Sequence, residues 1–257
     1  MTTVQRDAWQ ERRNAAAPAV QATARPAAAT NLVARHWLAV TNGVWGALSI
    51  LPWLAPLLMR AGVTGAGRLI YWVYGFLCHQ LADRSFFLFG RRAMYAYPEL
   101  VPGLSGGALR DGLRAFIGSE ALGYKVAWSA RMVALYGGVL LGGLMYALLR
   151  GKVRRLSWRG AALLLVPLLV DGLTHAASDL LFGLEGGWRY DNAWLAALSG
   201  YRLPWEFVRG NALGSFNSWM RLGSGLLAGL AGAWAVYPLI DIYLGGLRAR
   251  SPASPND

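Results

Sequence analysis

Charge is scarce in this chain. Only 15% of its 257 residues are Asp, Glu, Lys or Arg, whereas a soluble domain has about 25%. So few charges cannot cover a water-facing surface, and this excludes an ordinary soluble protein. There is a single cysteine, Cys78, which excludes an intramolecular disulfide and leaves the redox compartment undetermined.

Long runs without any charged residue occupy much of the chain instead. No Asp, Glu, Lys or Arg occurs at positions 36–59, 132–149, 160–170 or 222–240. Runs of about 20 apolar residues match a hydrocarbon core about 30 Å thick. The sequence therefore predicts an all-α fold, a polytopic membrane helix bundle with about five transmembrane helices. The predicted spans are 37–59, 69–89, 126–149, 160–182 and 219–245.

Three regions follow one another along the chain. Residues 1–34 are predicted to be a mobile basic tail, 35–247 the transmembrane bundle, and 248–257 a polar C-terminal tail. The bundle includes two outer loops, 90–125 and 183–217. Within the first loop, residues 109–123 have the pattern of an amphipathic helix.

Basic residues indicate the orientation and the partners. The net charge is +12, and residues 150–159 carry several basic residues and no acid. Because short cytoplasmic loops are rich in Lys and Arg, we predict that residues 150–159 and the C-terminus are cytoplasmic, in a prokaryotic inner membrane. Five spans would then place the N-terminus outside. Arginines at the ends of apolar runs favour the lipid bilayer as partner and argue against nucleic acid.

Polar residues recur near the outer ends of the predicted spans. Asp171, His175 and Asp179 are spaced i, i+4, i+8, so they share one face of a helix. Ionisable residues within a span are expensive and are expected to face the bundle interior. Two interpretations stay open: a structural pair of Asp171 with Arg131 or Arg221, or a binding site. The predicted polar cluster contains Cys78, His79, Arg84, Arg131, Asp171, His175, Asp179, Asn217 and Arg221.

A metal site is the less favoured use of these residues. Cys78, His79, Asp171 and His175 carry ligand types that zinc accepts. Neighbouring helical residues point about 100° apart, so Cys78 and His79 cannot easily share one ion. We expect no cofactor.

Small residues form two further patterns. Residues 137–143 and 223–232 are rich in Gly and Ala at spacings that let membrane helices approach closely. We expect these faces to pack within the bundle, in a homo-oligomer or against other membrane subunits.

Four sequence blocks together resemble a known family. They are CHQLADRSFFLFG, SARMVALYGG, PLLVDGLTH and NSWMRLGSGLLAGLAG, and they are similar to successive blocks of an uncharacterised bacterial and archaeal membrane-protein family, domain-of-unknown-function family 2085. The resemblance covers about residues 70–240. It implies a shared bundle and polar cluster, to which it adds Gln80 and Tyr136, but no known activity. The family's second block has two cysteines where this chain has Ser129 and Met132, which marks a divergent member and counts against a metal.

The positive rim of the cluster leads to a functional prediction. We expect an integral membrane protein with an intramembrane polar pocket near one face, binding or moving a small anionic ligand or lipid headgroup. One alternative is a non-catalytic accessory or structural subunit of a larger membrane complex, docking through the loop that carries Trp188, Trp194 and Trp205. A second is an intramembrane metal-dependent enzyme, although enzymatic activity is not the favoured expectation.

Overall fold

The computed structural model describes residues 28–104, 109–184 and 186–249. The chain divides into two compact units, residues 37–243 and residues 1–36 with 244–257. The smaller unit contributes only the start of one helix and the end of another to the described residues. Most of the predicted tails, 1–34 and 248–257, lies outside the described residues.

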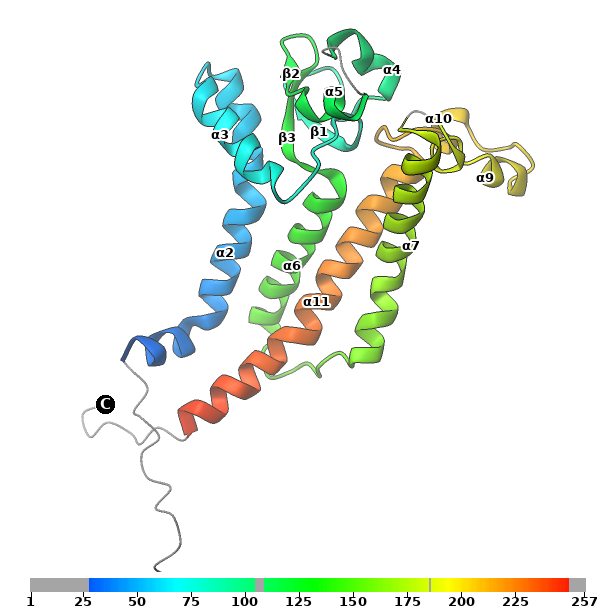
Figure 1. Ribbon diagram of the computed structural model, residues 1–257. Coiled ribbons are helices and arrows are strands. Elements are labelled where there is room, and N and C mark those ends of the chain that lie inside the picture. The colour runs from blue at the N-terminus through cyan, green and yellow to red at the C-terminus, as the bar shows by residue number, and fades with distance from the viewer. Residues whose placement is uncertain (1–27, 105–108, 185, 250–257) are drawn as a thin grey trace, which may run out of the picture. The chain divides into compact units, whose positions relative to one another are not determined.

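Four long helices dominate the larger unit (Figure 1). They are α2 (Ala28–Arg60), α6 (Ala130–Leu149), α7 (Trp158–Phe182) and α11 (Phe216–Ala249). Each contains a stretch long and apolar enough to cross a membrane. A helix satisfies its backbone hydrogen bonds internally, so it can cross a medium that offers no partners. The predicted membrane helix bundle is confirmed.

The predicted span at 69–89 is wrong. Its first part belongs to α3 (Thr64–Gly75), which has 12 residues and a length of about 18 Å, too short for a hydrocarbon core of about 30 Å. The chain then leaves the helix, and Gln80 adopts a positive φ of 51°. The 3₁₀ turn η1 (Ala82–Arg84) and strand β1 (Ser85–Leu88) follow. The described residues therefore contain four candidate spans rather than five.

A small antiparallel sheet adds to the otherwise helical fold. Its strand order is β1-β3-β2, with β2 (Gly118–Ser119) and β3 (Gly123–Ser129) forming a hairpin. Ser85 pairs with Ser129, and Phe87 pairs with Lys125. At Gly123 (φ 75°) a Cβ would lie 2.1 Å from the carbonyl oxygen of Leu88, so only glycine allows β1 and β3 to approach this closely.

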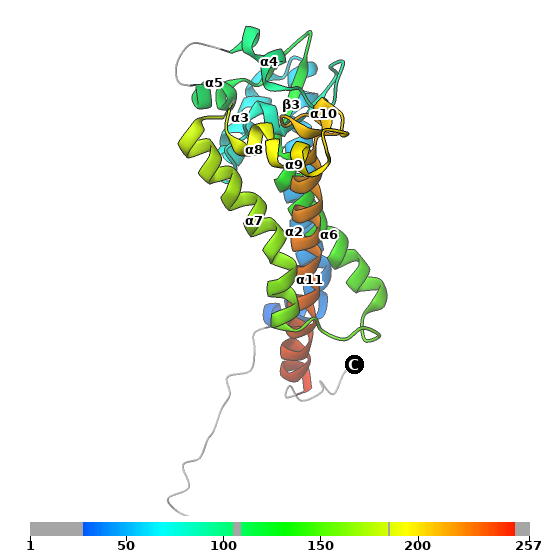
Figure 2. The same cartoon turned by 90° about the vertical axis from the view of Figure 1, so that its right-hand side faces the viewer.

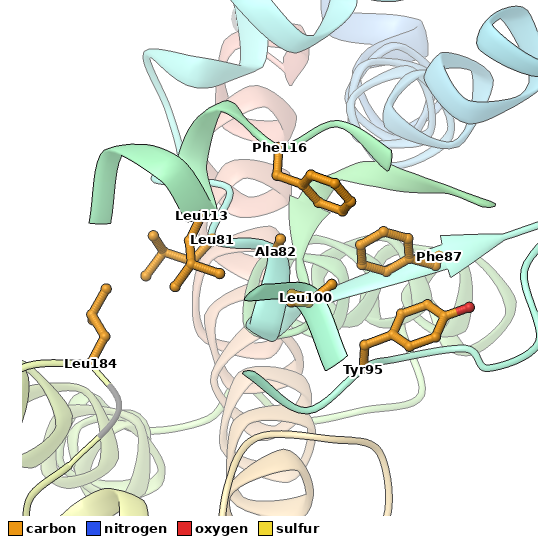
Figure 3. Packing of buried hydrophobic residues seen from close by; sticks show 8 residues of the cluster. All are labelled: Leu81, Ala82, Phe87, Tyr95, Leu100, Leu113, Phe116 and Leu184. Atoms are coloured by element: carbon orange, nitrogen blue, oxygen red, sulfur yellow. The ribbon is translucent and has the colours of Figure 1, made fainter. Parts of the chain in front are cut away.

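The segment from α3 to β3, residues 64–129, folds into what we call the cap, at one end of the long helices (Figures 1 and 2). It also contains α4 (Tyr97–Leu100), η2 (Val101–Gly103) and α5 (Leu109–Ala115). The amphipathic helix predicted over 109–123 is thus helical only to Ala115. A compact apolar cluster forms the interior of the cap and includes one residue from the segment after α7, Leu184 (Figure 3). Its members are Leu81, Ala82, Phe87, Tyr95, Leu100, Leu113, Phe116 and Leu184.

A second irregular segment lies at the same end of the bundle (Figures 1 and 2). Residues 183–215, here called the Trp loop, contain α8 (Trp188–Asp191), α9 (Ala193–Leu198) and α10 (Trp205–Val208). Gly183 and Gly187 have φ values of 81° and 83°. These left-handed conformations reverse the chain after α7 and bring α8 back against it.

The two glycine-rich runs pack against each other. A Cβ at Gly142 would lie 2.7 Å from the Cβ of Ala233, and one at Gly229 would lie 2.2 Å from the carbonyl oxygen of Leu135. Such approaches are what small residues permit between membrane helices. The small-residue faces of α6 and α11 thus contact each other within the chain.

The ends of the spans correct the expected topology. Near the start of the α2 span, Trp37 Nε1 donates to Asp241 of α11 at 3.0 Å, and Arg150 at the end of α6 donates to the same carboxylate. Trp37 in α2 therefore lies at the same end of the bundle as the 150–157 turn. The five-span expectation put the start of the first span and this turn on opposite sides, and it is wrong because residues 69–89 do not cross.

Candidate functional site

The stripe predicted on α7 faces the interior at the cap end of the bundle. Asp171 and His175 are almost fully buried, with 1% and 3% exposure, and the side chain of Asp179 is 15% exposed. Four other elements bring arginines to this stripe: η1 carries Arg84, α6 carries Arg131 in its first turn, α8 carries Arg189, and α11 carries Arg221 in its second turn.

Each carboxylate oxygen of Asp171 accepts a hydrogen bond from an arginine. Arg131 Nη2 donates to Oδ2 at 2.5 Å, and Arg189 Nη2, from α8, donates to Oδ1 at 2.6 Å. His175 Nε2 lies 3.7 Å from the same Oδ1. Of the two pairs considered from the sequence, Arg131 is a partner of Asp171. Arg221 forms no ion pair with it among the described residues.

A second group connects Arg84 to Arg221. Arg84 Nη2 contacts Asp179 at 2.8 Å, and its Nε lies 3.5 Å from Asp83. Asn211 Nδ2 donates to Asp83 Oδ2 at 2.5 Å, and Asn211 Oδ1 accepts from Arg221 Nη2 at 2.6 Å. Burial lowers the pKa of Arg84, but Asp83 and Asp179 outweigh that effect and raise it overall.

Arg221 differs from the other buried arginines. It is only 2% exposed, and its Nη2 lies 3.4 Å from His175 Nε2. No carboxylate lies within 4 Å of its guanidinium among the described residues. Its Nη1 is buried without a hydrogen-bond partner in the same part of the chain.

A cavity of about 500 Å³ lies among these side chains, within the range of about 300–1,000 Å³ typical of ligand pockets. Four arginines and one acid line it, and Arg110 of α5 is the exposed one of the four. The complete lining is Leu77, Cys78, His79, Gln80, Leu81, Arg84, Arg110, Ser129, Arg131, Met132, Gly172, His175, Ala176, Asp179, Leu180 and Arg221.

Three residues of the predicted cluster do not line the cavity. Asp171 accepts hydrogen bonds from Arg131 and Arg189 instead. Tyr136 packs its ring on Trp45 and Trp128, with centroid distances of 5.5 and 4.9 Å. Asn217 Nδ2 donates to the carbonyl oxygens of Arg189 and Gly210 at 2.7 and 2.9 Å. Asn217 thus anchors the Trp loop.

Four contributors were missing from the cluster predicted from the sequence: Asp83, Arg110, Arg189 and Asn211. Arg189 is 6% exposed and lies 18 positions from its partner Asp171. No helical periodicity connects the two, because the contact depends on the chain reversal after α7. The glycines of the sequence GLEGG indicate a turn after α7, where Gly183 and Gly187 have positive φ values. Glycines do not indicate in which direction the chain turns.

The metal candidates do not form a ligand set. Among the described residues no three His, Cys, Asp or Glu side chains are arranged to hold a metal ion. Cys78 is buried, and its Sγ accepts from the backbone N–H of Gln80 at 3.4 Å. Partial burial, together with Arg110, Arg114 and Arg84, lowers the pKa of His79 below its ordinary value.

Comparison with known proteins adds the family. Residues 120–235 match the model of a family described as "Predicted membrane protein (DUF2085)". The predicted resemblance is confirmed over residues 120–235. The matched range includes Arg131, Asp171, Arg189 and Arg221 but not the segment 78–85. No curated protein and no solved structure matches the chain.

Proposed function

We propose that this membrane protein binds an oxyanion, a phosphate or carboxylate group, in the cavity beside Arg221. The observation that carries the proposal is the buried Arg221 guanidinium without a carboxylate partner. Burying an isolated charge is very costly, and a buried charge is normally paired. A bound anion in the adjacent cavity supplies the missing partner.

The surrounding charges support this assignment. Asp83 and Asp179 contact Arg84, and Asp171 is shared by Arg131 and Arg189. Three aspartates thus balance three arginines, and the charge of Arg221 is left over. Arg110 adds a second positive charge on the cavity lining.

Unused hydrogen-bond donors lead to the same conclusion. Arg131 Nε and Arg221 Nη1 belong to cavity-lining residues and are buried without partners among the described residues. Buried polar atoms are nearly always hydrogen-bonded in folded proteins. Guanidinium groups suit phosphate and carboxylate oxygens because they can donate two parallel hydrogen bonds.

The distribution of basic residues indicates on which side of the membrane the cavity lies. The turn between α6 and α7 contains Arg150, Lys152, Arg154 and Arg155, and basic turns of this length stay in the cytoplasm. The cap and the cavity lie at the other end of the spans. We therefore place the anion site at the non-cytoplasmic face of a cytoplasmic membrane.

The accessory-subunit alternative has one favourable observation. The Trp loop exposes large apolar side chains, with Trp205 60%, Leu198 79% and Tyr201 80% exposed. Side chains of this kind suit either a protein partner or the membrane interface. The glycine faces of α6 and α11 offer less support, because they contact each other.

The test uses the purified protein in nanodiscs of neutral phosphatidylcholine. The probes are inorganic phosphate and dioctanoyl phosphatidic acid, and the readout is the shift of the thermal unfolding midpoint with probe concentration. A hydrogen bond to a charged group contributes about 1.5–3 kcal/mol, so Arg221→Gln should weaken binding about 10- to 100-fold. Arg159→Gln, an exposed arginine at the far end of α7, is the matched control and should bind like the wild type.

Two results would refute the proposal. One is that neither probe stabilises the wild-type protein. The other is that Arg221→Gln binds as tightly as Arg159→Gln. The unliganded Arg221→Gln protein should be at least as stable as the wild type, because the substitution removes an unpaired buried charge. A stoichiometric protein that copurifies, together with no probe binding, would favour the accessory-subunit alternative.

A further inference from the structure

We infer that the anion bound beside Arg221 is the headgroup of an amphiphile, a molecule with a hydrocarbon chain that reaches the arginines from the lipid phase. This inference rests on the proposed function and specifies the ligand class.

The cavity lining contains polar residues and apolar residues, here called its polar side and its apolar side. Arg84, Arg131, His175 and Arg221 form the polar side, at the junction of η1, α6, α7 and α11. Other members of the lining are apolar or small: Leu77, Met132, Gly172, Ala176 and Leu180. A site for a free inorganic anion has no use for such a wall, whereas a hydrocarbon chain packs on it favourably.

The apolar side is open at the protein surface. Leu180 is 84% exposed and Leu77 is 51% exposed, and Ala176 is also exposed. Leu180 lies on a membrane-spanning helix two residues before its end at Phe182. Exposed leucines on such a helix face lipid rather than water. The opening of the cavity therefore borders the lipid.

This apolar rim continues along α7. Leu169, Leu173, Ala176 and Leu180 are spaced i, i+4, i+7, i+11, which places them on one face of the helix. Leu169 is 55% exposed and Leu173 is 67% exposed. The stripe thus runs from the cavity toward the middle of the span. An amphiphile with its anionic group on Arg221 and its chain along this stripe would have the orientation of a lipid in one leaflet.

The size of the cavity agrees with this ligand class. A bare phosphate or acetate ion fills only a small part of about 500 Å³. A headgroup with the first part of its chain fills more of that space. It also lets the arginines contact the anion while the apolar wall contacts carbon.

The experiment compares three probes and two phenylalanine variants in phosphatidylcholine nanodiscs. Dioctanoyl phosphatidic acid should raise the unfolding midpoint at concentrations at least tenfold lower than inorganic phosphate, because its chains are buried as well. Dioctanoyl phosphatidylcholine has the same chains without a net negative charge and should produce no shift.

The variants test the route through the apolar side. Ala176→Phe fills the opening and should raise the phosphatidic acid concentration required at least tenfold. Ala177→Phe adds the same ring to the next exposed residue of α7, which does not line the cavity, and should leave binding unchanged. Both variants retain the polar cluster.

The outcomes separate this inference from the proposed function. If inorganic phosphate binds as tightly as dioctanoyl phosphatidic acid, and Arg221→Gln abolishes both, the anion site stands and the amphiphile is wrong. Equal binding of phosphatidic acid by Ala176→Phe and Ala177→Phe would likewise overturn the amphiphile route. Binding of both probes that is unchanged in Arg221→Gln would refute the proposed function itself.

Discussion

Two carboxylates on the membrane helices, Asp171 and Asp241, lie at opposite ends of the bundle. They accept hydrogen bonds from different sets of donors. Asp241 accepts from Trp37 Nε1 at 3.0 Å, from Tyr146 at 2.8 Å and from Arg150 Nε at 2.7 Å. There, Arg150 pairs with a single aspartate, and Trp37 and Tyr146 donate the other hydrogen bonds to its carboxylate. We call this group the Asp241 clasp.

The cap end has a surplus of arginine instead. Asp171 is satisfied by Arg131 and Arg189, yet Arg221 remains without a carboxylate and borders a cavity. A structural cluster needs only as many charges as it can pair, as in the Asp241 clasp. Asp171 thus pairs with two arginines that line or support the cavity, and under the proposed function Arg221 is the arginine that binds the ligand.

The largest effect should come from removing the charge of Asp171. Asp171→Asn leaves Arg131 and Arg189 without their carboxylate, and breaking a buried pair in this way costs about 3–5 kcal/mol. The free energy of unfolding, measured by chemical denaturation in detergent micelles, should fall by that amount. A change below about 1 kcal/mol would contradict the assigned role of Asp171 and remove the contrast between the two ends.

A pH effect should come next, and only at the cap end. Lys125 on β3 is buried, and its Nζ donates to the carbonyl oxygens of Gln80 and Arg114, each at 2.7 Å. Burial lowers the pKa of Lys125 from 10.5 to about 7. Between these values the unfolded chain binds more protons than the folded chain, so stability rises with pH. Below about pH 7 the cost of burying the ammonium group is fully present.

The gain from pH 7 to pH 9 should be up to about 2 kcal/mol. Hydrogen exchange of the cap amides should slow over this interval more than exchange near the Asp241 clasp. Lys125→Met removes the titrating group and should abolish the difference between the two regions. An unchanged pH dependence in this variant would show that another group is responsible.

Local periodicity explains what could be predicted from the sequence. The i, i+4, i+8 spacing put Asp171, His175 and Asp179 on one face, and their position near the end of a span put Arg131 and Arg221 at similar depth. These relations depend only on helix geometry and on the thickness of a membrane. The helices themselves followed from uncharged runs for the same reason.

Long-range packing explains what could not be predicted. The run containing Leu69, Leu77 and Leu81 has the composition of a span, but Leu81 is buried in the apolar interior of the cap and Leu77 lines the cavity. Composition alone does not distinguish burial in protein from contact with lipid. Strand β1 pairs with β3 across more than 30 intervening residues, and Arg189 reaches Asp171 only after the chain reverses. Neither contact has a local signal.

The smallest effect should come from the Asp241 clasp. Trp37 and Tyr146 donate to different oxygens of Asp241. Asp241→Asn keeps one oxygen, which can accept from Trp37, and its amide NH2 can donate to the Tyr146 hydroxyl. The charge that faces Arg150 is lost. That arginine side chain is 38% exposed, and exposed ion pairs contribute about 0–1 kcal/mol. Including weaker hydrogen bonds to the neutral amide, the free energy of unfolding should fall by about 1–2 kcal/mol in the denaturation assay used for Asp171→Asn.

Binding of dioctanoyl phosphatidic acid should be unchanged in Asp241→Asn, because the clasp lies at the other end of the spans. A loss of stability equal to that of Asp171→Asn would mean that the two carboxylates are structurally equivalent. The two carboxylate clusters would then differ in the unpaired charge of Arg221, and the free energy of unfolding of Arg221→Gln would be the measurement that distinguishes them. Because that substitution removes a charge with no counterpart in the Asp241 clasp, it should stabilise the unliganded protein where Asp241→Asn destabilises it.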